Sequence, residues 1–233
     1  MTPSAALSAR AVARRELTGA IVASARRQLA EIGPAALSVR AVARDLGMAS
    51  SAVYRYFPSR DDLLTELLVI IYGELADRLE QADAAVDRSD LGERWLTLGR
   101  TLRCWALAAP HEYAFLYGSP VPGYSAPDAT VAPSGRVTAI LLDIMAESDR
   151  RSSGTGARSE IYAGIREGSG IDLSDDACIR GLRAWGGLLG AISLELFGHL
   201  HRAVLDYDAH FELIVARLDP SAGAGQDALS TGR

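Results

Sequence analysis

The sequence predicts an all-α fold in which a small N-terminal three-helix bundle precedes a larger helical domain. Apolar residues recur at helical spacing along most of the 233 residues, and no long segment alternates with a period of two. Residues that begin or end helices, such as capping serines and a Gly-Pro pair, separate these segments. No run of 18 uninterrupted apolar residues occurs, so we expect no membrane span.

The first helix is expected from Arg10 to Ile32. Its apolar positions form one stripe at helical spacing: Leu17, Ile21, Ala25, Leu29 and Ile32. Gly33 and Pro34 follow directly and end the helix. We expect residues 1–9 to be disordered. The N-terminal residues are arginine-rich and lack the apolar segment of a signal peptide, so we expect a cytoplasmic protein.

Two short helices joined by a tight turn are expected next. Ser38 is a suitable N-cap for a helix over residues 39–46, and Ser50 for a second helix that ends near Phe57. Gly47 lies between the two helices, where a left-handed backbone conformation would strain a residue that carries a Cβ. Pro58 and Ser59 end the second helix.

A long fourth helix is expected over residues 60–84, with Asp61 and Asp62 at the positive end of its dipole. Further helices are expected at Leu91–Ala109, Glu112–Tyr117, Ser134–Ala146, Ser159–Arg166, Asp175–Leu200 and Asp206–Leu218. Residues 118–133 form a loop rich in proline, and residues 219–233 a tail that we expect to be disordered. The resulting domains are residues 10–60, linked by the helix over 60–84, and residues 85–218.

Charge is unevenly distributed along the chain, although the net charge is only −5. Residues 1–60 contain nine arginines and three acidic residues, whereas the remainder is strongly acidic. A basic end of this kind suits a polyanionic partner. The chain has no lysine, which excludes a Walker A phosphate loop and a pyridoxal Schiff base. Cys104 and Cys178 are far apart and are expected to be buried apolar residues rather than metal ligands or a disulfide.

Residues 39–57 have the spacing of a DNA-binding helix-turn-helix. Ala43 lies where the second helix must cross the first closely, and Val53 lies ten residues later, where it packs back against the first helix. Gly47 occupies the turn. The expected small core is completed by Val42, Leu46 and Phe57.

The residues around this core sort into two faces. Val53 and Phe57, four residues apart, face inward, so Ser50, Ser51 and Tyr54 lie toward solvent or a DNA groove. The Tyr54 and Tyr56 hydroxyls can donate to phosphate oxygens, and Arg40 and Arg60 can reach a phosphate or, for Arg40, a guanine edge. Two alternatives stay open, namely that Tyr56 is partly core and that Tyr54 is core.

The segment "LSVRAVARDLGMASSAVYRYFPSRDDLL" resembles the N-terminal domain of TetR-family transcriptional regulators, over about residues 15–68. The resemblance implies a homodimer with an all-α body that leaves its double-stranded operator DNA when a small ligand binds. It implies DNA-facing positions at Ser38, Val39, Arg40, Ser50, Ser51, Ala52, Tyr54, Tyr56 and Arg60. Tyr56 stands where the family often has histidine, and Arg60 where it usually has lysine.

Residues 91–218 resemble the C-terminal domain of a TetR subgroup named for a Trp-His-Gly pattern. Trp185 and Gly190 fit this pattern, whereas Leu189 replaces the histidine. Trp185, Leu189, Ile192 and Leu196 recur at helical spacing and predict a buried stripe. The same helix contains five glycines that permit close approach of another helix, for example in a dimer interface built with the last helix: Gly181, Gly186, Gly187, Gly190 and Gly198.

An apolar cavity between helices is the usual small-molecule site of an all-α domain. The residues expected to line one for a largely apolar effector are Trp105, Tyr113, Leu116, Tyr117, Trp185 and Leu189. The alternative is a fully packed core without a cavity.

These patterns together predict a ligand-responsive, DNA-binding regulator, most simply a repressor, with a helix-turn-helix bundle and a larger helical domain for ligand binding and dimerisation. We expect no enzyme activity, cofactor or metal, because the sequence contains no nucleophile elbow, cofactor loop or metal-ligand spacing. The alternatives are a helical interaction protein and a helical-bundle enzyme, neither of which would bind DNA.

Overall fold

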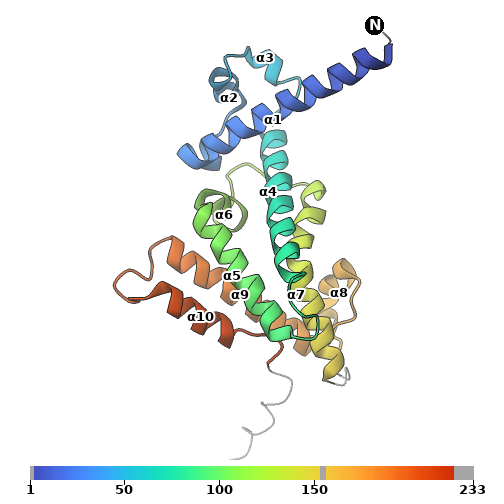
Figure 1. The fold of residues 1–233 in the computed structure, drawn as a ribbon, viewed down its shortest axis with the longest axis vertical. Coiled ribbons are helices and arrows are strands. Elements are labelled where there is room, and N and C mark those ends of the chain that lie inside the picture. The colour runs from blue at the N-terminus through green and yellow to red at the C-terminus, as the bar shows by residue number, and fades with distance from the viewer. Residues whose placement is uncertain (1–2, 153–155, 223–233) are drawn as a thin grey trace, which may run out of the picture. The chain divides into compact units, whose positions relative to one another are not determined.

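The computed structural model describes residues 3–152 and 156–222, and this part of the chain contains helices and loops but no strand (Figure 1). The predicted all-α fold is therefore confirmed. The α-helices are α1 (Pro3–Ala36), α2 (Val39–Asp45), α3 (Ser50–Val53), α4 (Arg60–Asp83), α5 (Leu91–Ala108), α6 (Pro110–Tyr117), α7 (Val131–Arg151), α8 (Ala163–Ser169), α9 (Asp175–Leu196) and α10 (Tyr207–Arg217). Short 3-10 turns at Asp128–Thr130 and Glu160–Tyr162 precede α7 and α8.

The chain divides into two compact units, which we describe separately. The N-terminal unit comprises residues 1–72 and 111–132, and the C-terminal unit comprises residues 73–110 and 133–233. Helix α4 contributes to both units, since the division falls after Tyr72. From sequence we expect residues 111–132 in the larger domain, whereas in the structure α6 and the loop after it group with the helix-turn-helix.

The N-terminal unit is built around one apolar core. Its fully or nearly buried residues come from α1, α2, α3 and α4 and include Ile21, Leu29, Val42, Ala43, Val53, Phe57, Leu63 and Leu67. Gly33 interrupts α1 with a φ of 74°, as the sequence predicts. The helix begins at Pro3, however, so residues 3–9 are helical where a disordered segment was expected, and residues 1–2 lie outside the described part.

Helix α3 is shorter than the sequence suggests. It covers Ser50–Val53, and the backbone turns through residues 54–56 before Phe57 enters the core. The N-cap is Ala49, which makes no side-chain capping bond, so the expectation that Ser50 caps this helix is wrong. Tyr54 and Tyr56 consequently lie on and just after the C-terminal end of the helix.

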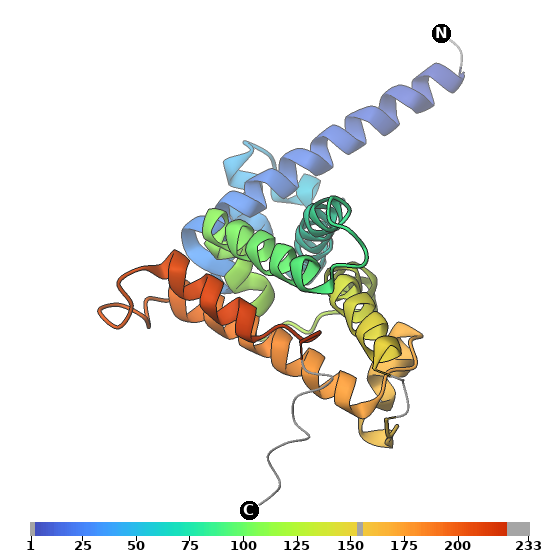
Figure 2. The same ribbon diagram turned by 60° about the horizontal axis from the view of Figure 1, so that its bottom comes forward.

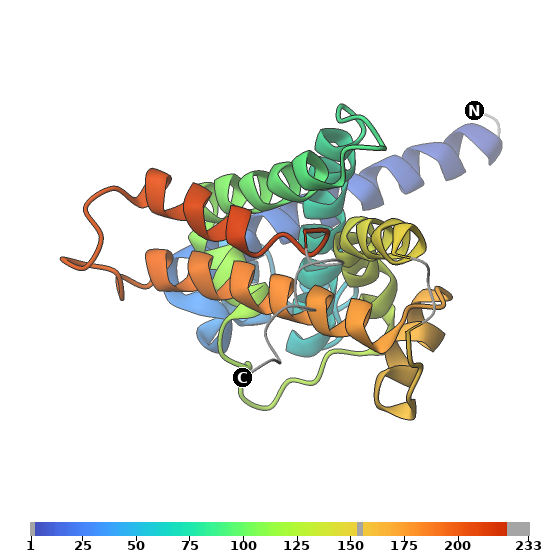
Figure 3. The same ribbon diagram turned by 90° about the horizontal axis from the view of Figure 1, so that it is seen from below.

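The C-terminal unit packs α5, α9 and α10 against one another, and Figures 2 and 3 show α9 and α10 side by side. Trp95 is completely buried and donates a hydrogen bond from Nε1 to the carbonyl oxygen of Val215 at 2.8 Å. A Cβ added to Gly99 would lie 2.6 Å from Val215 Cγ2, and one added to Gly187 would lie 2.6 Å from Leu218 Cδ2. Glycine therefore allows the close approach of α10 to both α5 and α9.

Helix α7 extends to Arg151, well beyond the expected end at Ala146. The segment Asp128–Arg151 is long and apolar enough to cross a membrane by length and composition. One such helix is weak support for a span, because the core helix of a globular protein satisfies the same criteria. Here the helix buries Val137, Ile140 and Ile144 in the protein core. Of the expected disordered tail, residues 223–233 lie outside the described part of the chain.

An ion-pair network joins α4, α5 and α7 within the C-terminal unit. Arg94 is 2% exposed and donates to both carboxylate oxygens of Asp83, at 2.8 and 3.0 Å. Its other partner is Asp143, at 2.9 Å. Arg88 also pairs with Asp83 but is mostly exposed. Because a buried guanidinium is costly unless it is paired, Arg94 fixes the end of α4 against the next helices.

Candidate DNA interface and effector site

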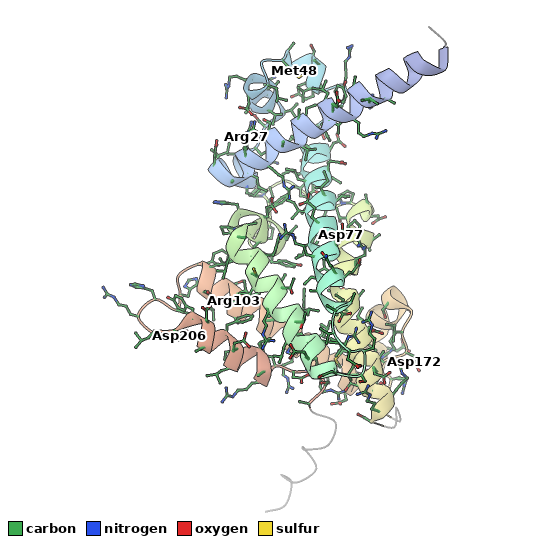
Figure 4. The ribbon with its side chains drawn as sticks, in the orientation of Figure 1. Arg27, Met48, Asp77, Arg103, Asp172 and Asp206 are labelled. Carbon is green, nitrogen blue, oxygen red and sulfur yellow. The ribbon has the colours of Figure 1, made fainter. Side chains whose placement is uncertain are left out.

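The turn between α2 and α3 is closed by short backbone contacts. The Ser38 hydroxyl caps α2 by accepting from the amide of Ala41 at 3.1 Å. Gly47 adopts the predicted left-handed conformation, with a φ of 63°. The amide of Met48 then donates a hydrogen bond to the carbonyl oxygen of Ala43 at 2.8 Å. Met48 is labelled at this turn in Figure 4. The arrangement is that of a helix-turn-helix, in which the second helix presents its N-terminal residues outward.

Most residues predicted to face DNA are accessible. Arg40, Ser51 and Tyr54 are exposed, and Ser38, Ser50, Ala52, Tyr56 and Arg60 are half-buried. Tyr54 is 39% exposed, which argues against the alternative that it belongs to the core. Val39 is the exception, because its side chain is 2% exposed and packs in the core of the unit. The prediction that its side chain faces DNA is therefore wrong.

Arg60 has a role that the sequence did not suggest. Its guanidinium donates to the carbonyl oxygens of Leu37, Pro34 and Ala35 at 3.1, 2.8 and 3.2 Å. These carbonyls lie around the end of α1 and the connection to α2, so Arg60 ties the start of α4 to that connection. The side chain is thus engaged inside the protein, in contrast to the predicted contact with phosphate.

Three other arginines of the helix-turn-helix region remain exposed. Arg40, Arg44 and Arg55 are exposed, and within residues 3–152 and 156–222 the structure gives them no carboxylate partner. Arg27, by contrast, pairs with Asp45 at 2.6 Å. A hydrogen bond from Ser24 and the Arg27 contact lower the pKa of Asp45. Positive charge therefore remains available next to α2 and α3, where it can attract phosphate.

An ion pair connects α1 to α6 within the N-terminal unit. Arg26 donates to both carboxylate oxygens of Glu112, at 2.8 and 3.2 Å, and both side chains are largely buried. The sequence offered no signal for this pair, since its members are far apart along the chain. It attaches α6 to the first helix of the DNA-binding bundle.

The residues predicted to line an effector site are divided between the two units. Tyr113 is completely buried on α6, and its ring centre lies 5.4 Å from that of Tyr117. The Tyr117 ring meets Tyr72 of α4 edge to face, at 6.3 Å, and Leu116 beside it is half-buried. Burial raises the pKa of both Tyr117 and Tyr72. Aromatic side chains therefore join α4 to α6 in the N-terminal unit.

The remaining predicted effector residues belong to the C-terminal unit. Trp105 is nearly buried and borders a groove of about 450 Å³. The groove is lined by Arg78, Gln81, Ala82, Arg100, Thr101, Cys104 and Trp105. Cys104 is exposed, which contradicts the expectation that it is buried, whereas Cys178 is buried as expected.

The buried stripe of α9 differs from the predicted one. Trp185, Leu189 and Leu196 are only half-buried, and of the predicted stripe only Ile192 is fully buried. The buried positions are instead Ala177, Cys178, Arg180, Gly181, Ala184, Leu188 and Ile192. Small residues explain the difference, because Gly181 and Ala184 let α9 approach its neighbours closely, and a Cβ on Gly181 would already lie 3.3 Å from Met145. A tryptophan does not fit such a contact.

The chain matches the models of two protein families, one in the N-terminal and one in the C-terminal part of the sequence. The model of the tetR family of bacterial regulatory proteins matches residues 21–67, and that of the tetracyclin repressor-like C-terminal domain matches residues 95–218. The chain belongs to the TetR family. The HTH-type transcriptional regulators Rv1816 of Mycobacterium tuberculosis (strain ATCC 25618 / H37Rv) and Mb1846 of Mycobacterium bovis (strain ATCC BAA-935 / AF2122/97) are each 40% identical to it over 219 residues. These matches cover 88% of this chain and 94% of each relative.

Solved structures agree with the assignment of this TetR-family protein. The crystal structure of the regulatory protein SCO4313 is 32% identical and superposes with a TM-score of 0.73, covering 88% of this chain and 96% of that one. FadR, a fatty acid degradation regulator from Bacillus halodurans, is 16% identical with a TM-score of 0.53 over 88% of this chain and 98% of its own, and shows the shared fold. The TetR-family protein is accordingly a DNA-binding transcriptional regulator, of a family whose members respond to ligands.

Proposed function

We propose that this TetR-family regulator is a homodimeric repressor, and that a small molecule releases it from its operator. The observation that carries the proposal is that Arg40 and Arg44 of α2, and Arg55 just after α3, are exposed on a helix-turn-helix with a buried apolar core. The proposed DNA contacts are Ser38, Arg40, Ser50, Ser51, Ala52 and Tyr54, and Tyr56 is proposed to take part through its ring rather than its hydroxyl. Arg60 contributes through the positively charged amino end of α4 rather than through its guanidinium.

The proposed dimer uses α9 and α10. Leu182, Leu194 and Phe197 are large exposed apolar residues on or at the end of α9, and Leu213 is exposed on α10. Gly186 and Gly190 have open space where a Cβ would lie, so the surface of α9 can accept another helix closely. Two such chains would present α3 to successive major grooves about 34–36 Å apart.

Effector control is proposed to involve α6. The Arg26–Glu112 pair connects this helix to α1, and the ring contact of Tyr117 with Tyr72 connects it to α4. A displacement of α6 would therefore move the helices of the DNA-binding bundle. We assign the effector a largely apolar structure, because its proposed contacts within the N-terminal unit, Tyr113, Leu116 and Tyr117, are aromatic or aliphatic. By linkage, such a ligand weakens DNA binding only by its difference in affinity for the two states.

We also propose that the protein belongs to the Trp-His-Gly subgroup of the TetR family. Trp185 and Gly190 support membership of the Trp-His-Gly subgroup, with Leu189 in place of the histidine. The functional assignment implies a cytoplasmic protein without enzyme activity, because a regulator of this type acts by binding operator DNA.

Binding to DNA fragments from the source genome tests the main proposal. We expect specific fragments to be retained in a gel shift, with an affinity that falls linearly in a log–log plot against salt, by a slope of about 0.9 per phosphate contacted. An affinity that does not change with salt would contradict the phosphate contacts. Absence of any specific fragment would favour a helical interaction protein instead.

Sedimentation of two charge variants tests the dimer. Phe197→Glu places a charge in the proposed interface and should shift the protein toward a monomer. Leu205→Glu is the matched control, because Leu205 is 100% exposed in the loop between α9 and α10. Equal sedimentation of the Phe197 variant and the wild type would contradict an interface at this end of α9.

A further inference from the structure

Arg14 of α1 lies against Tyr56, three residues beyond the end of α3. Its guanidinium carbon is 5.1 Å from the centre of the Tyr56 ring, within the range of a cation–π contact. Tyr56 is half-buried, whereas Arg14 is exposed. Figure 1 shows α1 continuing past α2 and α3 toward its amino end. The contact therefore brings a cation from the first helix to the edge of the helix-turn-helix.

Three other arginines of the N-terminal unit are engaged in contacts within the protein. Arg26 pairs with Glu112, Arg27 with Asp45, and Arg60 with backbone carbonyls. Arg14 has no carboxylate partner within the described residues, and its contact is with the face of an aromatic ring. A ring face attracts the cation without neutralising its charge, so the guanidinium can still bind an anion.

We propose that Arg14 is a phosphate-binding residue of the DNA interface and that the Tyr56 ring is the platform that holds it in place. The interface then extends from α2 and α3 onto α1, and its partner there is the sugar-phosphate backbone of the duplex. A guanidinium held in one orientation loses less side-chain freedom when it meets a phosphate, and it can bind two oxygens at once. The inference rests on the proposed function, since it adds a contact to the same DNA interface.

In this proposal the ring of Tyr56 acts by holding Arg14, whereas the sequence suggested that its hydroxyl donates to a phosphate oxygen. If the hydroxyl donated to phosphate, phenylalanine at this position would lose the contact. If the ring supports Arg14, phenylalanine retains the platform and leucine does not. The two substitutions therefore separate the two roles.

The experiment compares the full-length wild type with Arg14→Ala, Arg15→Ala, Tyr56→Phe and Tyr56→Leu, using a fluorescently labelled duplex of random sequence as the probe. Arg15 is the matched control, because it is the adjacent exposed arginine and its removal changes the net charge equally. Affinity is measured at several salt concentrations, and circular dichroism melting verifies that each variant is folded at the assay temperature. Random sequence suffices, since phosphate contacts do not depend on base identity.

We expect Arg14→Ala to lower the affinity about tenfold and to reduce the salt slope by about 0.9, the value for one phosphate. Tyr56→Leu should reproduce most of this loss, Tyr56→Phe should bind like the wild type, and Arg15→Ala should have a clearly smaller effect. Affinity of Arg14→Ala equal to that of the wild type would overturn the inference, as would equal losses for Arg14→Ala and Arg15→Ala. An equal loss for Tyr56→Phe and Tyr56→Leu would overturn the platform role.

The result also distinguishes this inference from the function on which it rests. A wild type that binds duplex DNA with the expected salt dependence, together with an unchanged Arg14→Ala variant, overturns the inference alone. A wild type that does not bind duplex DNA overturns the proposed function and the inference together.

Discussion

The two units of the protein use arginine in different ways. In the C-terminal unit most described arginines are paired with carboxylates, as in Arg94 with Asp83, or Arg103 with Glu195 at 2.8 Å and Asp208 at 2.7 Å (Figure 4). In the N-terminal unit Arg40, Arg44 and Arg55 are exposed and have no such partner within the described residues. The same residue type therefore stabilises the fold in one unit and remains available for a partner in the other.

The difference teaches how an acidic chain can bind a polyanion. Net charge describes the whole sequence, but a phosphate responds to charges within about a Debye length, roughly 8–10 Å at physiological salt. Many acidic residues of the C-terminal unit lie in ion pairs with arginines of the same unit, whereas Arg40, Arg44 and Arg55 of the DNA-binding bundle have no such partner within the described residues. Substitutions in either unit can test this contrast.

The largest effect is expected for Asp83→Ala. Removing Asp83 leaves the buried Arg94 with only the half-exposed Asp143, so the free energy of unfolding should fall by about 3 kcal/mol, as for other broken buried pairs. Urea denaturation measures the loss. Arg88→Ala is the matched control, because Arg88 pairs with the same carboxylate from an exposed position and should cost at most about 1 kcal/mol. Similar losses for both variants would contradict the structural role of Arg94.

Tyr54→Ala should weaken DNA binding while leaving stability almost unchanged. Because Tyr54 is 39% exposed at the end of α3, its loss should weaken operator binding by about 1–3 kcal/mol, or roughly 5- to 150-fold. The melting temperature should remain close to that of the wild type. A melting temperature lowered by many degrees would instead place Tyr54 in the core and remove it from the interface.

Arg60→Lys tests an exception to this contrast. Arg60 lies in the basic N-terminal unit, but its guanidinium binds backbone carbonyl oxygens of the protein. Lysine keeps the charge but cannot bind the carbonyl oxygens of Leu37 and Pro34 together, so the free energy of unfolding should fall by about 1–2 kcal/mol. Operator affinity should fall with an unchanged salt slope, because no phosphate contact is removed. A smaller slope with unchanged stability would show that Arg60 acts on phosphate after all.

The smallest effect is expected for Asp45→Asn, measured as stability against pH. Hydrogen bonding lowers the pKa of Asp45 below its ordinary value of 3.8, so its contribution is present above that value and is lost as the pH falls through the folded-state pKa. The asparagine variant should therefore lose less stability than the wild type below about pH 4. Ser24→Ala should reduce the effect in part, since Ser24 supplies the first hydrogen bond. Identical acid profiles would contradict the assigned shift.

The local sequence pattern was sufficient to predict much of the fold and part of the DNA interface. The positions of Gly33, Ser38 and Gly47 predicted a helix break, a helix cap and a left-handed turn, and all three are present. These features depend on the conformational preferences of a few adjacent residues. Val39 was misassigned because its DNA-facing position was implied by the family resemblance, which does not specify whether a side chain at this position is buried.

Contacts between distant segments could not be predicted in this way. The attachment of α6 to α1 by Arg26 and Glu112, the binding of Arg60 to backbone carbonyls, and the incomplete burial of Trp185 on α9 all depend on which surfaces meet. The sequence by itself determined where the helices lie and that the positive charge is concentrated in the first 60 residues. Only the tertiary structure decided which arginines remain available to DNA, because neutralisation depends on spatial proximity to a carboxylate or carbonyl oxygen, which sequence spacing does not specify.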